Sequence, residues 1–376
     1  MKIQVDNIVD QAGTGAPNIP DGVTIDGLGL SATSLEYYEQ SSLPENPSAG
    51  AMWFNPATRK YYIYSNGDWT NVNFTPTTAF FGSRGLFAGG YSFDFYTIDY
   101  VTIATPGNST AFGESTASRI WLAACSDGTY GLFGGGSDTV ANAQVNLIDY
   151  VTIATLGNAI DFGDLTIARI RLAACSDGIY GLFGGGQLGF GGAGTNVIDY
   201  VPIATPGNAI DFGDLTVARS GIASCSDGTY GLFAGGSLQS LPANLVDYVT
   251  IATPGNATDF GDLTVGKLDV AGCSDRTYGL FGGGETGSSG SNFSSDIIDY
   301  VTIATPGNAT DFGDLTVARW SLAACSDGTY GLFGGGGFNI SSIDSVTIAT
   351  PGNATYFGDL YFGIPRERLA SCSGAA

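Results

Sequence analysis

The sequence contains six copies of one unit, and this repetition limits the fold more than any other feature. The period is about 49 residues, and the tripeptide Gly-Leu-Phe followed by small residues recurs in every copy. A period of roughly 20–50 residues is typical of solenoids, propellers and other arrays in which each unit packs on its neighbours. A second marker, Asp-Tyr-Val-Thr or a close variant, starts at Asp99, Asp149, Asp199, Asp247, Asp299 and Asp344.

The best-defined unit, between Arg319 and Leu360, reads as four short β-strands separated by turns. Small and β-branched residues dominate its apolar segments, and helical periodicity is absent. An Asp-Gly turn at Asp327 follows the first segment, and a Pro-Gly-Asn turn at Pro351 precedes the last. Four short strands in a repeat of about 50 residues predict a propeller blade.

These residues resemble the Kelch repeat, in which an Arg, a small-residue strand, an Asp-Gly turn and a strand ending in Gly-Gly follow one another. The match covers residues 84–376, with Phe where the Kelch family has a Trp. The first copy lacks its first strand, whereas the chain ends with such a strand at residues 366–373. We therefore expect an all-β fold: a six-bladed Kelch-like propeller of four-stranded blades over residues 76–376, closed by the C-terminal strand and preceded by a small β-rich segment.

Cations repeat with the units, which favours a structural role for them. We expect each to pair with an acid of the same or the next blade, the repeated Asp being the candidate partner, or to cap strand-end carbonyls. These cations are Arg119, Arg169, Arg219, Lys267, Arg319 and Arg366.

The six cysteines also occupy one position of the repeat. Equivalent positions in neighbouring blades would have to approach within about 7 Å to form disulfides, so we expect small buried thiols on the innermost strand instead. They are Cys125, Cys175, Cys225, Cys273, Cys325 and Cys372.

Composition and charge exclude several functions. The absence of His excludes His-based triads, His-ligated zinc or copper, and haem with a proximal His. A net charge of −22 disfavours nucleic acids and anionic membranes as partners. No apolar run reaches about 18 residues and no apolar signal segment opens the chain, so we expect neither membrane insertion nor secretion.

Acidic residues give no sign of an enzyme or a metal site. No pair of carboxylates breaks the repeat, as the catalytic acids of a glycoside hydrolase would. A second repeated series of acids, which begins at Glu114, offers one carboxylate per blade, whereas Ca²⁺ takes about 6–8 oxygens. We therefore expect no enzyme activity, no cofactor and no metal.

Residues 1–75 lie outside the repeat. The stretch from Gly50 to Trp69 alternates like a small β-meander with aromatic faces. This stretch, together with the opening from Asp6 to Thr24, is similar to modules of tailed-bacteriophage fibres and other virion proteins. In that family the N-terminal part attaches to the particle and the distal part meets the host. The resemblance implies a virion protein of the tail or fibre, assembled in the host cytoplasm, whose residues 1–75 bind other virion proteins.

Comparison of the six units with one another locates the variation. Two turns, Ser-Asp-Gly and Pro-Gly-Asn, barely change, whereas the segment after the Gly run and the residues after the repeated cation differ from unit to unit. Both variable connections of a four-stranded meander lie on one face, which is either a recognition surface or a set of drifting loops. Aromatic side chains there suit protein hot spots and sugar stacking. The binding-face candidates are Phe93, Phe95, Tyr96, Trp121, Arg171, Phe190, Phe293, Trp320 and Phe338.

Together these features predict a non-enzymatic virion protein, tail fibre or tail-associated. Its propeller would present the variable face to a host-surface glycan or protein, or to neighbouring virion proteins. The alternative is a purely architectural or decoration protein of capsid or tail without a receptor role. A homo-oligomer on the particle is compatible with both hypotheses.

Overall fold

The computed structural model describes the chain in two compact units, Met1–Thr77 and Thr78–Ala376, close to the boundary expected after residue 75. Apart from one 3₁₀ turn, η1 (Tyr361–Gly363), its regular elements are β-strands, which confirms the all-β expectation for the described part of the chain. None of these elements is a helix that could cross a bilayer. The described residues are 18–25, 30–34, 37–39, 51–55, 60–65, 68–72, 82–91, 96–239, 241–287, 293–337 and 339–374.

The first unit contains the predicted meander and additional strands. β4 (Met52–Asn55), β5 (Lys60–Ser65) and β6 (Asp68–Val72) are antiparallel neighbours. The meander gains a fourth strand that the sequence argument did not predict, because β3 (Tyr37–Glu39) pairs with β4 in parallel. A parallel pair needs a long connection, which the chain between these two strands supplies. The remaining two strands, β1 (Asn18–Ile25) and β2 (Leu30–Ser34), form an antiparallel pair.

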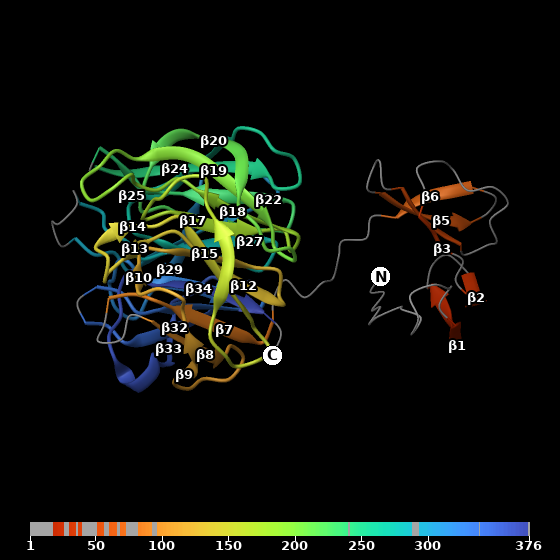
Figure 1. Ribbon diagram of the computed structural model, residues 1–376, viewed down its shortest axis with the longest axis horizontal. Coiled ribbons are helices and arrows are strands. Elements are labelled where there is room, and N and C mark those ends of the chain that lie inside the picture. The colour runs from red at the N-terminus through yellow and green to blue at the C-terminus, as the bar shows by residue number, and fades with distance from the viewer. Residues whose placement is uncertain are drawn as a thin grey trace. The chain divides into compact units, whose positions relative to one another are not determined.

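The second unit contains six antiparallel sheets of one plan within its described residues (Figure 1). Four strands, successive along the chain, lie side by side in each sheet. Sheet 1 is the exception, because its first strand comes from the end of the chain. We number the sheets from that one.

The strands of sheets 1 to 3 are as follows. Sheet 1 contains β34 (Ala370–Gly374), β7 (Arg84–Ala88), β8 (Thr97–Thr102) and β9 (Thr110–Glu114). Sheet 2 contains β11 (Ala123–Ser126), β12 (Tyr130–Gly134), β15 (Leu147–Thr152) and β16 (Ile160–Asp164). Sheet 3 contains β17 (Ala173–Ser176), β18 (Tyr180–Gly184), β19 (Thr195–Pro202) and β20 (Ile210–Arg219).

Sheets 4 to 6 continue the same order. Sheet 4 contains β21 (Ala223–Ser226), β22 (Tyr230–Ala234), β24 (Leu241–Thr250) and β25 (Thr258–Lys267), with the short β23 (Ser237–Leu238) on β24. Sheet 5 contains β26 (Ala271–Ser274), β27 (Tyr278–Gly282), β28 (Ile297–Thr302) and β29 (Thr310–Asp314). Sheet 6 contains β30 (Ala323–Ser326), β31 (Tyr330–Gly334), β32 (Ser342–Thr347) and β33 (Thr355–Asp359). A further small sheet joins β10 (Arg119–Ile120), β13 (Ser137–Asp138) and β14 (Ala143–Gln144).

The two ends of the repeat array meet in sheet 1. Strand β34 pairs with β7, with Ala370 opposite Ala88 and Gly374 opposite Arg84. The first strand of every sheet also contacts the first strands of two other sheets, in the order β11, β17, β21, β26, β30, β34 and back to β11. The C-terminal strand therefore supplies the position that is missing from the first copy of the repeat.

Neighbouring sheets interlock where a ring of one sheet meets a glycine of another. A Cβ added at Gly134 would lie 2.5 Å from the ring of Phe183, and one at Gly184 would lie 2.6 Å from the ring of Phe233. Both rings are fully buried. The repeat thus supplies a ring to one neighbour and places a small residue against the ring of the other, glycine in four sheets and alanine (Ala88 and Ala234) in two.

Each sheet buries one repeated cation against the repeated Asp, so the predicted pairing is confirmed. The side chains of all six pairs are at most 3% exposed. The nitrogen–oxygen distance is 3.1 Å for Arg169–Asp199, 2.7 Å for Arg219–Asp247, 3.0 Å for Lys267–Asp299 and 2.5 Å for Arg319–Asp344. The other two pairs are Arg119–Asp149 and Arg366–Asp99.

The predicted capping of carbonyls also occurs, at the same side chains. Arg219 Nη1 donates to the carbonyls of Gly235 at 2.9 Å and Leu245 at 2.8 Å. Its partner Asp247 accepts a further bond of 2.7 Å from the hydroxyl of Thr216, on strand β20 of the preceding sheet. Burial lowers the pKa of Arg219, and the neighbouring Asp247 opposes that shift. The pair therefore fastens the segment between sheets 3 and 4 onto sheet 4.

Breaking one of these pairs from the cation side should be costly. We expect Arg219→Met to lower the free energy of unfolding by about 3–5 kcal/mol, because the Asp247 carboxylate would remain buried without a counter-charge. Lys267→Arg should be neutral or stabilising, since five of the six sheets already hold Arg at this position. Urea unfolding followed by tryptophan fluorescence measures both, and an Arg219→Met protein as stable as the wild type would contradict the structural role.

Candidate functional site

The two variable connections of each repeat lie together, as the sequence predicted. Isolated β-bridges join the segment before the first strand to the connection between the second and third strands, for example Ile170 with Gln187 and Leu268 with Glu285. We call the side formed by these connections the variable face. The opposite side, the constant face, carries the Ser-Asp-Gly and Pro-Gly-Asn turns.

The constant face repeats the same hydrogen bonds from sheet to sheet. In the Ser-Asp-Gly turn of sheet 2, Asp127 Oδ1 accepts bonds of 2.7 Å from the amides of Thr129 and Tyr130. Asp177, Asp227, Asp275 and Asp327 accept the equivalent pairs of bonds in sheets 3 to 6. These turns therefore serve the fold in the same way in each of those sheets.

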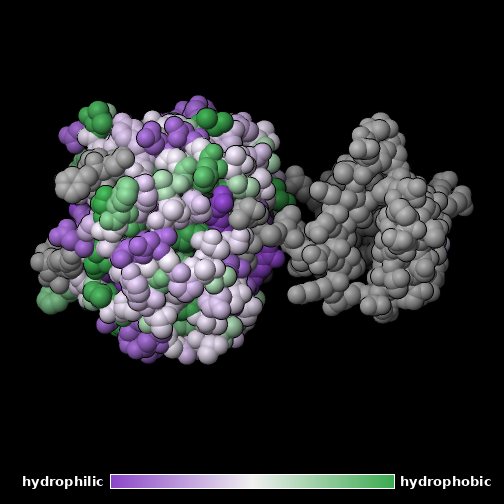
Figure 2. All heavy atoms as spheres, turned by 90° about the horizontal axis from the view of Figure 1, so that it is seen from below, coloured by the Kyte–Doolittle hydropathy of each residue, from purple (hydrophilic) through white to green (hydrophobic). Residues whose placement is uncertain are grey.

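Several predicted binding-face aromatics are exposed. Phe190 is 54% exposed, Phe293 63% and Tyr96 37%. Tyr91 and Phe362, which the sequence argument did not select, are also exposed on this face. On the side of the second unit shown in Figure 2, hydrophobic residues form separate patches among polar ones. Three further candidates lie outside the described residues: Phe93, Phe95 and Phe338.

The candidates Trp121, Arg171 and Trp320 also lie on this face, where all three are half-buried. The Trp320 indole packs so closely that a Cβ added at Gly337 would lie 2.5 Å from it. Trp121 and Arg171 turn inward and contact each other, with the Arg171 guanidinium carbon 4.9 Å from the centre of the indole.

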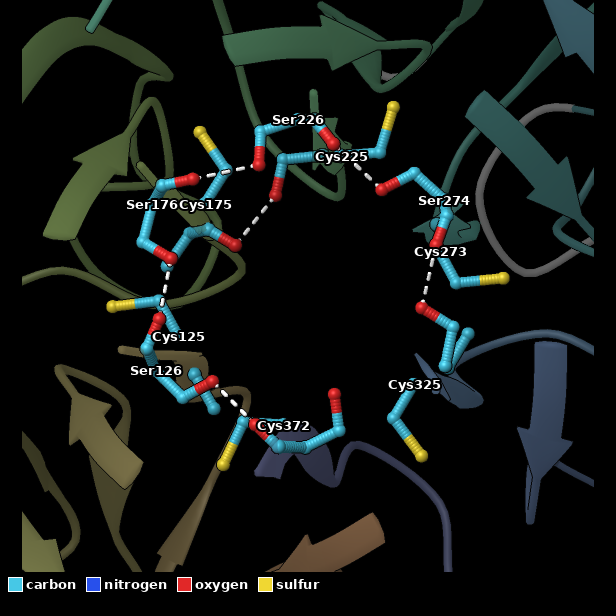
Figure 3. Close-up of a pocket in the computed structure, with 17 residues that line it drawn as sticks. Cys125, Ser126, Cys175, Ser176, Cys225, Ser226, Cys273, Ser274, Cys325 and Cys372 are labelled. Atoms are coloured by element: carbon cyan, nitrogen blue, oxygen red, sulfur yellow. Dashed lines mark hydrogen bonds between the residues drawn. The ribbon is translucent and has the colours of Figure 1, made fainter. Parts of the chain in front are cut away.

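A central channel passes between the first strands of the sheets (Figure 3). It has a volume of about 90 Å³ and is lined by β11, β17, β21, β26, β30 and β34. Serine hydroxyls link these strands, since Ser176 Oγ donates to the carbonyl of Ser126 at 2.5 Å and Ser226 Oγ to that of Ser176 at 2.7 Å. Ser126, Ser274 and Ser326 make equivalent bonds to the carbonyls of Ser373, Ser226 and Ser274.

The six thiols are free and buried, which confirms the prediction for the cysteines. Their sulfur atoms point away from the channel in Figure 3, into the spaces between sheets. Cys175 fits against Gly231 of sheet 4, where an added Cβ would lie 2.7 Å from the sulfur. Burial raises the pKa of Cys372 to about 12 and raises that of the other five thiols as well. These thiols fill space, and burial favours their protonated form, which is a poor nucleophile.

At the variable face, six equivalent residues surround the end of the channel. Each is the second residue after the repeated cation, and the amide of each donates to the carbonyl of the one before it at 2.7–3.0 Å, the first donating to the last. All six have a φ between 52° and 67°, in the left-handed region. We call this set the mouth: Trp121, Arg171, Gly221, Asp269, Ser321 and Arg368.

The mouth side chains form one cluster of charges around an indole. The guanidinium carbon of Arg368 lies 4.4 Å from the centre of the Trp121 ring, so Trp121 contacts two guanidinium groups. Arg171 faces Asp269 at 3.7 Å, and Ser321 Oγ donates to the Asp269 carboxylate at 3.2 Å. Phe190 packs against Trp121, with ring centres 5.6 Å apart.

Sequence reasoning missed Arg368 and Asp269 as site residues. Sequence variation could have identified both residues, because the second position after the repeated cation is among the most variable of the repeat. The mouth residues also line a cavity of about 60 Å³. Within the described ranges no group of three or more His, Cys, Asp or Glu side chains is placed to hold a metal ion.

The buried thiols should resist alkylation. At about pH 8 iodoacetamide is expected to modify none of the six cysteines of the folded protein, because the raised pKa keeps them protonated and burial excludes the reagent. In urea all six should react, and intact mass measures both states. Rapid modification of any thiol in the folded protein would contradict the structural role.

Neither a protein-family model nor a curated protein matches this sequence. Function is therefore inferred from the repeat, from the resemblances of its motifs and from the geometry of the variable face.

Proposed function

We propose that residues 82–374 form a closed six-bladed propeller of the Kelch type, and that this propeller is the recognition module of a non-enzymatic virion protein. The observation that carries the proposal is the one-sided variation of a repeated scaffold. Six nearly identical sheets keep one face constant, whereas the other differs in sequence at every connection.

Three features support a closed ring. The C-terminal strand β34 pairs with β7, the first strands contact one another in cyclic order, and the six hydrogen bonds of the mouth return to the residue from which they start. Closure also removes the sheet edges that an open array would expose.

The variable face has the features of a binding surface. Large aromatic side chains such as Phe190, Phe293 and Tyr91 are exposed on it in separate places, around the half-buried cluster of the mouth. Such residues serve as anchors for proteins or sugars. The buried acids that repeat with the sheets are occupied by cations, which leaves the fold without a catalytic pair among them.

The partners follow from the resemblance of the first 75 residues to phage fibre modules. We infer that residues 1–75 attach the protein to the tail or a fibre, and that the variable face meets a glycan or protein of the host surface. If the variable face instead contacts neighbouring virion proteins, the protein is architectural.

Closure has a direct test. Deletion of residues 366–376 removes β34 and Arg366, which pairs with Asp99 across the chain ends. We expect the melting temperature to fall by about 10 °C or more, since leaving Asp99 buried without its cation costs about 3–5 kcal/mol and each kcal/mol shifts the melting temperature by about 2–4 °C.

A permuted chain controls for this deletion. It carries residues 366–374 before β7, joined by a Ser-Asp-Gly turn like those of the other sheets, and should recover the wild-type melting temperature. A deletion variant as stable as the full chain, or a permutant no better than the deletion, would contradict closure.

Recognition is tested on the full-length protein, labelled and added to the host cells. Phe190→Ala with Phe293→Ala should weaken binding about tenfold or more, because truncation of aromatic anchors typically costs this much. The matched control is Ile160→Ala with Ile210→Ala, two similarly exposed side chains beside the Leu-Gly-Asn and Pro-Gly-Asn turns of the constant face. Equal loss in both double variants would contradict a binding role for the variable face.

Immunogold labelling of particles, with an antibody against residues 76–376, separates the two virion hypotheses. Gold at fibre tips or at the distal end of the tail supports recognition, and gold over the capsid or tail shaft supports the architectural reading. Particles that carry no label would contradict both.

A further inference from the structure

The mouth carries side chains that its backbone does not require. All six residues have a positive φ, which glycine adopts freely, and Gly221 does so in the same circle of hydrogen bonds. At the other five positions the left-handed conformation is unfavourable, costing about 1–2 kcal/mol at an L-residue. Strained side chains that converge on one point indicate a function for those side chains rather than for the backbone.

Two of the few cations of this acidic protein meet at the mouth. Within the described part of the second unit, the cations outside the six buried pairs are Arg84, Arg171, Arg276 and Arg368. Two of these four contact the same indole, that of Trp121. A guanidinium group has five N–H donors in a fork that matches a carboxylate, so the pair is suited to an anionic group.

The acids beside Arg171 and Arg368 leave some hydrogen-bond donors of both guanidinium groups available. Asp269 lies 3.7 Å from Arg171, beyond hydrogen-bond distance. Glu367 contacts Arg368 at 3.1 Å through the Nη2 atom. Each guanidinium group therefore faces one carboxylate of the protein and keeps further donors.

Two buried donors at the mouth have no partner among the described residues. Trp121 Nε1 and Arg368 Nε are both buried and make no hydrogen bond within that part of the chain. Both residues line the cavity of about 60 Å³, which is large enough for a carboxylate or a few water molecules. Since a buried N–H without an acceptor is costly, a group that supplies acceptor oxygens would be stabilised here.

Flat apolar rings flank these donors. Phe190 packs on Trp121 and is about half exposed, and the exposed Tyr91 ring lies 5.7 Å from the guanidinium carbon of Arg368. Such rings stack on the apolar faces of sugars. An extended peptide would instead need free backbone groups at a strand edge, and the six mouth amides are already bonded to one another.

We propose that the mouth binds a carboxylated sugar. Its carboxylate would lie between Arg171 and Arg368 and accept from Trp121 Nε1, and its ring would pack against Phe190 and Tyr91. This assignment deepens the proposed recognition function and rests on it.

The test uses the full-length protein on an array of glycans that contain hexuronic or nonulosonic acids, each beside its carboxyl-reduced counterpart. We expect binding to at least one acidic glycan and at least tenfold weaker binding to the reduced form, because a hydrogen bond to a charged group contributes about 1.5–3 kcal/mol. The same glycan should change the tryptophan fluorescence, and Trp121→Phe should abolish that change.

The variants Arg171→Gln and Arg368→Gln should each weaken binding about tenfold or more. Arg276→Gln is the matched control, because Arg276 also has a positive φ, of 77°, but lies in a turn of the constant face. Unfolding curves in urea for all three variants show whether the fold is preserved.

The proposal is overturned if the array shows no acidic glycan bound, if the reduced forms bind equally well, or if Arg276→Gln loses as much affinity as the mouth variants. It is also overturned if a polyglutamate peptide binds at the mouth as tightly as any acidic glycan. The proposed recognition function is judged separately from this ligand. If one of these results is obtained, but the protein still binds host cells and Phe190→Ala with Phe293→Ala still weakens that binding, the recognition function is supported and only the ligand is wrong.

Discussion

The buried pair between a cation and the repeated Asp is the interaction on which the rest of the structure depends. In sheet 4, Arg219 joins the carboxylate of Asp247 to the carbonyls of Gly235 and Leu245, and Thr216 of the preceding strand donates to the same carboxylate. This one network therefore fixes the end of strand β20 in sheet 3 and holds the chain against sheet 4 where it passes from one sheet to the next. Because the charges are fully buried, loss of either partner is far more costly than loss of an exposed pair.

Close contacts between sheets explain why variation is confined to one face. The Phe183 ring needs Gly134, and the Cys175 sulfur needs Gly231, so a larger residue at either glycine would collide with the neighbouring sheet. The turns of the constant face are fixed by side-chain bonds such as those of Asp127. On the variable face such contacts involve different residues in different sheets, for example Trp320 with Gly337 in one and Asp138 with the amides of Val140 and Ala141 in another, so these connections can differ between repeats.

Most of the architecture was predictable because each structural feature occurs in all six repeated units of the sequence. The strands, the ion pairs and the buried thiols all occur at one position of every unit, so the reason for each could be read from a single unit. The mouth was harder to foresee. Trp121 was selected as a binding-face residue, but its contact with Arg368, a residue almost at the other end of the array, was not predicted. Contacts between residues so distant in sequence leave no local pattern.

The sequence by itself determined the four strands of each repeated unit, the turns between them, the acids that accept the buried cations and the positions free to vary, because these depend on local periodicity and on repetition. Only the tertiary structure decided what the variable residues do. The left-handed backbone at the second residue after each cation brings the side chains of the five mouth residues other than Gly221 to one end of the channel. There Arg171, Asp269 and Arg368 come together from three different sheets, which no single repeat could show.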